Sequence, residues 1–139
     1  MKYIKTISTI IGSVLGFLFG NLDGFLITLI VFVIFDYITG VASAIINNDL
    51  SSEIGFKGII KKIIIFIVVS VANLIDAKVI QRGGVLRTAT IFFYLSNEGI
   101  SILENIAKCG IPLPKKLLNV LKQLKENNDE RDSDTGKDE

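Results

Sequence analysis

The segment from Gly24 to Asn48 holds a single charged residue, Asp36, in 25 consecutive positions. A helix needs about 20 mainly apolar residues to cross a hydrocarbon core of about 30 Å. In lipid, only helices and closed barrels satisfy every backbone hydrogen bond, and the chain has too few alternating segments for a barrel. The segment is therefore expected to be a transmembrane helix, and the predicted fold class is an all-α, polytopic membrane protein.

Four segments are expected to cross the membrane, within a transmembrane domain of residues 1–110. The expected spans are residues 6–22, 24–47, 59–79 and 86–108. Lys2 and Lys5 before the first apolar run resemble a signal peptide, but no small-residue cleavage site stands out, so the segment is taken as retained. Because the first span is short for a bilayer, the sequence leaves three and four spans open.

Small residues recur at every fourth position in two of these segments. Gly12, Gly16 and Gly20 keep this spacing in the first segment, and Gly40 and Ala44 repeat it in the second. Small residues four apart allow another membrane helix to approach closely, so these positions are expected to pack helices together. The alternative is that the glycines only make the first segment flexible, or let it lie in the membrane interface.

Each of the last three segments carries polar side chains along one side. Between Arg87 and Lys108 they recur at alternating steps of three and four, which places them on one helix face. A charge at the bilayer centre costs at least about 2.5 kcal/mol, so such faces are expected to meet a bundle interior, other subunits or water. Taken alone, the segment also fits a soluble amphipathic helix. The candidate lesion-lining or oligomer-contacting residues are Asp36, Ser43, Asn73, Asp76, Arg87, Thr90, Tyr94, Asn97, Glu98, Ser101 and Glu104.

The distribution of lysine and arginine predicts the orientation. With four spans, the N-terminus, the 48–58 linker and the C-terminus share one side, which carries most of the basic residues near the membrane. Cytoplasmic segments carry the excess of positive charge, so the C-terminus is expected to be cytoplasmic. Basic residues expected at the membrane surface are Lys61, Lys62, Lys115 and Lys116.

Beyond Gly110 the chain changes character. Residues 111–126 predict a short, basic amphipathic helix that lies on an anionic membrane surface or self-associates. Its apolar face is expected to comprise Leu117, Val120, Leu121 and Leu124. Residues 127–139 are almost wholly charged and polar, so they cannot bury apolar surface and are expected to be disordered.

No catalytic or metal-binding constellation is visible in the sequence. The chain has no histidine and one cysteine, Cys109, which excludes a Ser-His-Asp triad and a thiolate cluster within one chain. Asp36, Glu98 and Glu104 could be a carboxylate set, but intramembrane carboxylates more often pair with lysine or arginine, or line water. The net charge of +1 predicts no surface for nucleic acid. We expect a non-enzymatic protein without a cofactor or nucleic-acid partner.

Three stretches resemble a known family. They are FDYITGVASAIINNDLSSEIGFKGIIKK from Phe35 to Lys62, the segment from Asn73 to Asp76, and YLSNEGISILENIAKCGIPLPKKL from Tyr94 to Leu117. Together they resemble the phage lysis and toxin-secretion holins of Gram-positive bacteria and their prophages, over roughly two-thirds of the chain. The residues that match the family pattern are Asp36, Gly40, Gly55, Gly58, Lys61, Lys62, Asp76, Glu98, Glu104 and Pro114.

The resemblance implies a small protein of the bacterial inner membrane that accumulates late in infection. Such a protein associates with itself in the lipid bilayer and forms lesions through which an endolysin or a large toxin crosses. The family resemblance implies no cofactor.

Two other functions fit the same polar-sided helices. A small channel or transporter subunit would show steady, ion-selective conductance without passage of proteins. An antiholin-like membrane scaffold would form oligomers without leakage.

Overall fold

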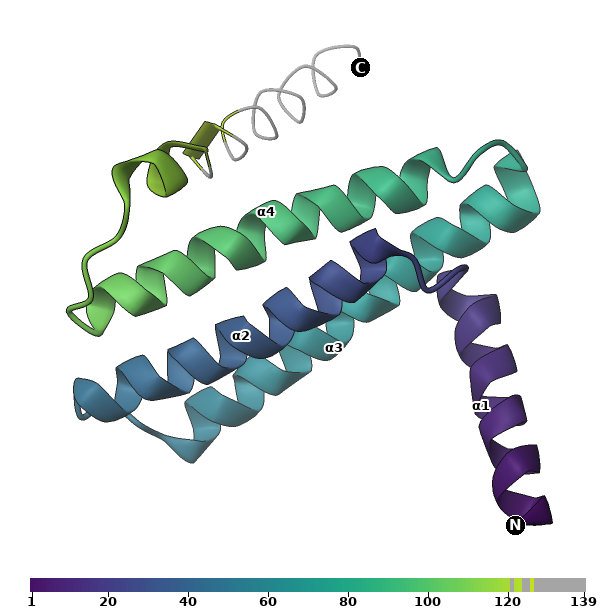
Figure 1. The fold of residues 1–139 in the computed structure, drawn as a ribbon, viewed down its shortest axis with the longest axis horizontal. Helices are drawn as coiled ribbons and strands as arrows, with labels where there is room; N and C mark the ends of the chain where they lie inside the picture. Colours follow the sequence, from purple (N-terminus) through teal and green to yellow (C-terminus); the bar gives the residue numbers. More distant parts are fainter. Residues whose placement is uncertain (121, 124–125, 127–139) are drawn as a thin grey trace.

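The computed structural model describes residues 1–120, 122, 123 and 126. Within that part of the chain the protein is helical and contains no strand, as predicted. The elements in order are α1 (Lys2–Phe19), α2 (Gly24–Ile46), α3 (Ser52–Ile75), the π-helical turn η1 (Asp76–Ile80) and α4 (Val85–Lys108) (Figure 1).

Helices α2, α3 and α4 form a three-helix bundle in which α3 is antiparallel to the other two (Figure 1). The first turns of α2 and α4 meet where Asp23 contacts Arg87, and their last turns meet where Asn47 contacts the carbonyl of Lys108. Helix α4 packs mainly on α2 and also contacts α3, whereas the backbones of the sequence neighbours α2 and α3 approach each other closely at few positions. The last helix therefore holds the other two together.

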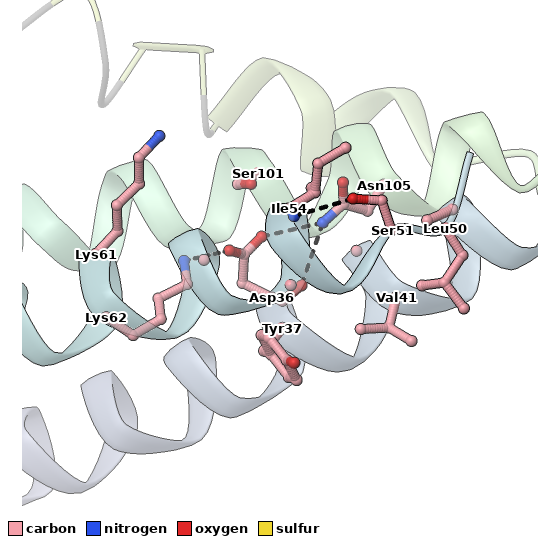
Figure 2. A pocket seen from close by; sticks show the side chains of 14 residues that line it. Asp36, Tyr37, Val41, Leu50, Ser51, Ile54, Lys61, Lys62, Ser101 and Asn105 are labelled. Carbon is pink, nitrogen blue, oxygen red and sulfur yellow. Dashed lines mark hydrogen bonds and ion pairs between the residues drawn. The ribbon is translucent and has the colours of Figure 1, made fainter.

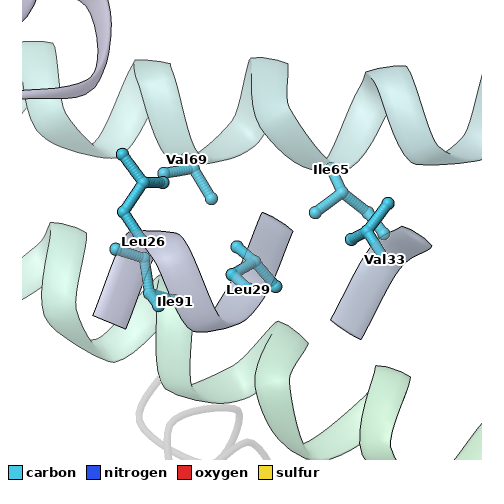
Figure 3. Packing of buried hydrophobic residues seen from close by; sticks show 6 residues of the cluster. All are labelled: Leu26, Leu29, Val33, Ile65, Val69 and Ile91. Carbon is cyan, nitrogen blue, oxygen red and sulfur yellow. The ribbon is translucent and has the colours of Figure 1, made fainter. Parts of the chain in front are cut away.

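The dry core occupies the half of the bundle nearest the start of α2. Leu29, Val69 and Ile91 are fully buried there, one from each helix. The whole cluster, shown in Figure 3, comprises Leu26, Leu29, Val33, Ile65, Val69 and Ile91. Its β-branched members restrict side-chain rotamers, which suits close packing inside a helix bundle.

The outer surface of the bundle is also apolar. Ile34 and Ile38 of α2 and Ile63 and Ile67 of α3 each expose about half of their surface. Contiguous apolar patches of this kind mark contact with protein or membrane. Among the described residues, α1, α2 and the segment Ser52–Ile80 are long and apolar enough to cross a bilayer. The chain is thus a polytopic, all-α membrane protein.

Helix α4, the expected fourth span, does not reach the same hydropathy. Its polar residues lower the average, although they lie mostly toward the bundle. The doubt between three and four spans concerned the first segment, but α1 is long and apolar enough to cross a bilayer, and the helix that falls short is α4.

Helix α3 begins at Ser52, earlier than the span expected from about residue 59. The Ser51 hydroxyl caps it by accepting a hydrogen bond from the Ile54 N–H at 3.2 Å, and Glu53 pairs with Lys57 at 2.7 Å. Both interactions stabilise a first turn. Most of the expected 48–58 linker is therefore helical.

Helix α1 projects away from the bundle and has no buried residue (Figure 1). No atom lies within 4 Å of a Cβ added at Gly12 or Gly16, so within one chain these glycines pack against no helix. Gly20 instead forms the turn after α1 with φ +74°, and an added Cβ would lie 2.7 Å from Asn73 Oδ1. Gly20 therefore allows the chain to make a tight turn after α1.

The expected helix of residues 111–126 is described only in part. Residues 115–120 are helical, and Lys115, Lys116 and Leu117 are exposed. Leu121 and Leu124 of its expected apolar face, and the whole expected tail of residues 127–139, lie outside the described residues.

Candidate functional site: a buried ion triad at the floor of a cavity

A lysine and two carboxylates meet inside the bundle, each from a different helix. Lys62 Nζ of α3 donates to Asp36 Oδ2 of α2 and, at 2.5 Å, to Glu98 Oε2 of α4. All three residues lie near the middle of their helices, and only 7% of Asp36 and 6% of Glu98 is exposed. We call this cluster the ion triad.

The position of Lys62 differs from the expectation that it lies at the membrane surface. Its side chain is 18% exposed and its ammonium group turns inward to the carboxylates. The neighbouring Lys61 is exposed, as a surface lysine would be. Two buried carboxylates on facing helices attract the lysine that can reach both, and the sequence shows no distances across helices.

Asn105 completes the surroundings of Asp36. Its Nδ2 donates to Asp36 Oδ1 at 3.0 Å (Figure 2). The same Nδ2 also lies 3.2 Å from Thr39 Oγ1, within hydrogen-bond distance. Asn105 is not among the candidate residues predicted from the sequence. The signal that could have found it is its spacing, because it follows Glu98 by two helical turns on the same face.

The ion triad contains two acidic groups and one basic group. Removing ions from water costs several kcal/mol each, and the cost is recovered only when partners and hydrogen bonds surround the charge. Lys62 is the shared partner of both carboxylates, so the arrangement depends on it more than on either acid.

A cavity of about 340 Å³ extends from the ion triad toward the α2–α3 loop (Figure 2). Asp36 and Lys62 lie at its inner end, and Leu50 and Ser51 belong to the loop at the other end. The remaining lining residues are Tyr37, Gly40, Val41, Ala44, Ile54, Gly55, Gly58, Lys61, Ser101 and Asn105. The small residues Gly40 and Ala44 thus border a cavity; an added Cβ at Gly40 would lie 3.5 Å from Asn105 Nδ2.

A second polar cluster, the Arg87 junction, lies at the opposite end of the bundle. The Arg87 guanidinium donates to Phe19 O at 2.7 Å, to Asn21 O at 2.8 Å and to Asp23 Oδ2 at 2.7 Å. Hydrogen bonding from Arg87 lowers the pKa of Asp23 below its usual 3.8.

Asn73 and Asp76 belong to the same junction. Asn73 Nδ2 and Ser70 Oγ donate hydrogen bonds to the carbonyl of Leu18. This carbonyl lies in the last turn of α1, where carbonyl groups have no partner within the helix. The Asp76 carboxylate accepts the N–H of Arg87 at 2.7 Å and so caps the start of α4.

The remaining predicted residues divide by burial. Ser43 is buried, and Thr90, Tyr94, Asn97 and Ser101 are half-buried. Glu104 is exposed. The buried polar residues of α4 are Arg87, Ser96 and Glu98, and the half-buried Asn105 bonds Asp36. Three of these four, Ser96, Glu98 and Asn105, lie outside the predicted stripe, so the inward face is rotated from it. Among the described residues no group of three His, Cys, Asp or Glu side chains could hold a metal ion.

Comparison with known proteins gives one consistent result. The family model described as "Bacteriophage holin family" matches residues 13–126. An uncharacterized 14.9 kDa protein in the nagH 3′ region of Clostridium perfringens is 44% identical over 89% of this chain and 94% of its own length. A "probable holin" of Bacillus phage phi105 is 38% identical over 84% of each chain. No solved structure matches.

Proposed function

The chain belongs to the bacteriophage holin family, and from that premise we propose that it assembles into lesions in the bacterial cytoplasmic membrane. The lesions release an endolysin, or in another genomic setting a toxin, and host lysis follows.

The observation that carries the proposal is the contrast between the two sides of the bundle helices. Apolar side chains such as Ile34 and Ile67 face outward, whereas Asp36, Lys62 and Glu98 are paired inside. A single copy therefore hides these three charges from lipid. When many copies crowd together, the same helices can turn their charged sides toward a shared water-filled opening, because contacts between copies replace those within one copy.

We propose that α4 crosses the membrane together with α2. The two helices run side by side in the same direction, so a bilayer that surrounds α2 also surrounds α4. Of the charges that would oppose this, Arg87 and Glu98 are paired inside the chain, and the exposed Glu104 lies about one turn from the end of α4. The C-terminus is then cytoplasmic, on the side where Lys115 and Lys116 add to the positive charge.

The direct test is inducible expression in a bacterial host, with and without a co-expressed endolysin. Holin action predicts an abrupt stop in growth and release of the endolysin after a delay. An ion-selective conductance that retains the endolysin would support a channel instead, and oligomers without leakage would support a scaffold.

A matched pair of variants tests whether the ion triad takes part in lesion formation. Glu98→Gln removes a buried carboxylate that Lys62 contacts, and Glu104→Gln removes an exposed one from the same helix. We expect a shifted lysis time for Glu98→Gln and a time near that of the unmodified protein for Glu104→Gln. Identical timing for both variants at equal membrane levels would remove the triad from the mechanism.

A further inference from the structure

We propose that the cavity ending at Asp36 is a water-filled vestibule, open on the side of the α2–α3 loop and closed at mid-bundle by the ion triad. Water and small solutes then enter each copy to about half its depth, from one side only. This inference rests on insertion of the bundle in a membrane and does not require lesion formation.

The size and chemistry of the cavity favour water. One water occupies about 30 Å³ of liquid volume and needs two to four polar partners. A volume of about 340 Å³ therefore admits several waters, and Asp36, Lys62, Ser101 and Asn105 supply the partners. Cavities that stay dry are lined by apolar side chains alone.

A tyrosine ring lies between α2 and α3 at this end of the bundle. The Tyr37 ring of α2 faces the two glycines of α3, where an added Cβ would lie 3.6 Å from Tyr37 Oη at Gly55 and 3.8 Å from Tyr37 Cε2 at Gly58. A glycine supplies no side chain to fill space. The backbones of α2 and α3 approach each other closely at few positions, which agrees with a gap beside the ring.

An apolar core separates this cavity from the polar pocket at the Arg87 junction on the opposite end of the bundle. Beyond the triad lie the fully buried Leu29, Val69 and Ile91, which leave no exposed surface (Figure 3). Entry from one side also explains how two carboxylates share one ammonium group, since contact with water reduces the cost of burying charge.

The test is thiol accessibility in membrane vesicles prepared right-side-out and inside-out. Cys109 is the chain's one cysteine, so Cys109→Ser gives a cysteine-free background. Ser101→Cys places a thiol in the cavity wall, and Ser96→Cys places one on the same helix at a site that is 4% exposed. Both changes are nearly isosteric. Asp49→Cys in the α2–α3 loop and Arg82→Cys at the opposite end report the two sides of the membrane.

The probe is trimethylammonium-ethyl methanethiosulfonate, which is charged and does not cross lipid. The cysteine thiolate attacks its thiosulfonate sulfur, a disulfide forms, and methanesulfinate leaves. Because only a thiol in contact with water ionises readily, hydration decides the reaction. Expression is kept at a level at which the two reference cysteines react from opposite sides only.

The vestibule predicts that Ser101→Cys is labelled from the same side as Asp49→Cys, and not from the side of Arg82→Cys. Ser96→Cys is expected to remain unlabelled from both sides. Ala44→Cys, in the opposite wall of the cavity, should behave like Ser101→Cys and guards against one misfolded variant. Protection of both wall cysteines would show a dry cavity, and labelling of both from either side would show that the triad does not close it. Either result overturns the proposal and leaves the lysis assay unaffected.

Discussion

The Nζ atom of Lys62 on α3 lies 2.5 Å from Oε2 of Glu98 on α4, a residue 36 positions later in the sequence. The same ammonium group forms an ion pair with Asp36 on α2. One side chain thus ties together all three helices of the bundle, which makes it the first residue to test.

We expect Lys62→Met to lower the free energy of unfolding by about 3–5 kcal/mol, because it leaves two buried carboxylates without their cation. The measurement is unfolding of the detergent-solubilised protein. Lys61→Met is the control, since Lys61 is exposed and makes no ion pair among the described residues. Equal losses for the two variants would contradict a special role for Lys62.

The triple variant Asp36→Asn/Lys62→Met/Glu98→Gln separates charge from packing. Removing all members of a buried ion cluster leaves no uncompensated charge, so most of the stability lost in Lys62→Met should return. If the triple variant is less stable than Lys62→Met alone, the cost of that substitution arises from packing.

We expect Arg87→Lys to loosen the junction between α1 and the bundle. The arginine fork reaches Phe19 O, Asn21 O and Asp23 at once, and a lysine is a single point donor that cannot reproduce this. Each lost bond to a charged group is worth about 1.5–3 kcal/mol. Limited proteolysis should then cut faster near residues 20–23, while Arg82→Lys, an exposed control, leaves the cutting rate unchanged.

The Arg87 junction should weaken in acid. Arg87 lowers the pKa of Asp23 in the folded protein below 3.8, so the contribution of this pair is complete above pH 3.8. It is lost as the pH falls through the lower, folded pKa, where the carboxyl group takes up a proton. Asp23→Asn should therefore remove part of the acid dependence of the unfolding temperature.

Asparagine is a suitable replacement at this position. It keeps a side-chain oxygen that can cap the Leu26 N–H, so the variant changes the charge and not the cap. Asp49→Asn in the α2–α3 loop serves as the control. If both variants keep the full acid dependence, other carboxyl groups cause it.

Gly12 and Gly20 belong to the same four-residue repeat, but we expect their replacement by alanine to affect stability differently. Gly20→Ala should cost roughly 1–2 kcal/mol, because residue 20 has φ +74° and its Cβ would meet the Asn73 side chain. Gly12→Ala lies in open space within a helix and should be neutral or stabilising, by up to about 1 kcal/mol. The measurement is thermal unfolding of dilute protein in detergent. A loss at residue 12 as large as that at residue 20 would indicate a contact of α1 beyond the single chain.

The local pattern of residues was enough to predict the helices and a membrane protein. Long apolar runs with few charges have one solution in lipid, so the all-α class and the buried position of Asp36 could be inferred from residues close in sequence. The same pattern did not show that α3 begins at Ser52, because a capped, ion-paired first turn is polar and looks like a linker.

What the sequence by itself determined is which residues must avoid lipid, since that follows from their chemistry alone. Only the tertiary structure decided which partners they find: Lys62 between Asp36 and Glu98 instead of at the surface, Asn105 on Asp36, and Glu104 outside. The physical reason is that these choices depend on how each helix is rotated about its axis and on which helices meet. Both are set by packing between residues far apart in the chain, on which helical periodicity carries no information.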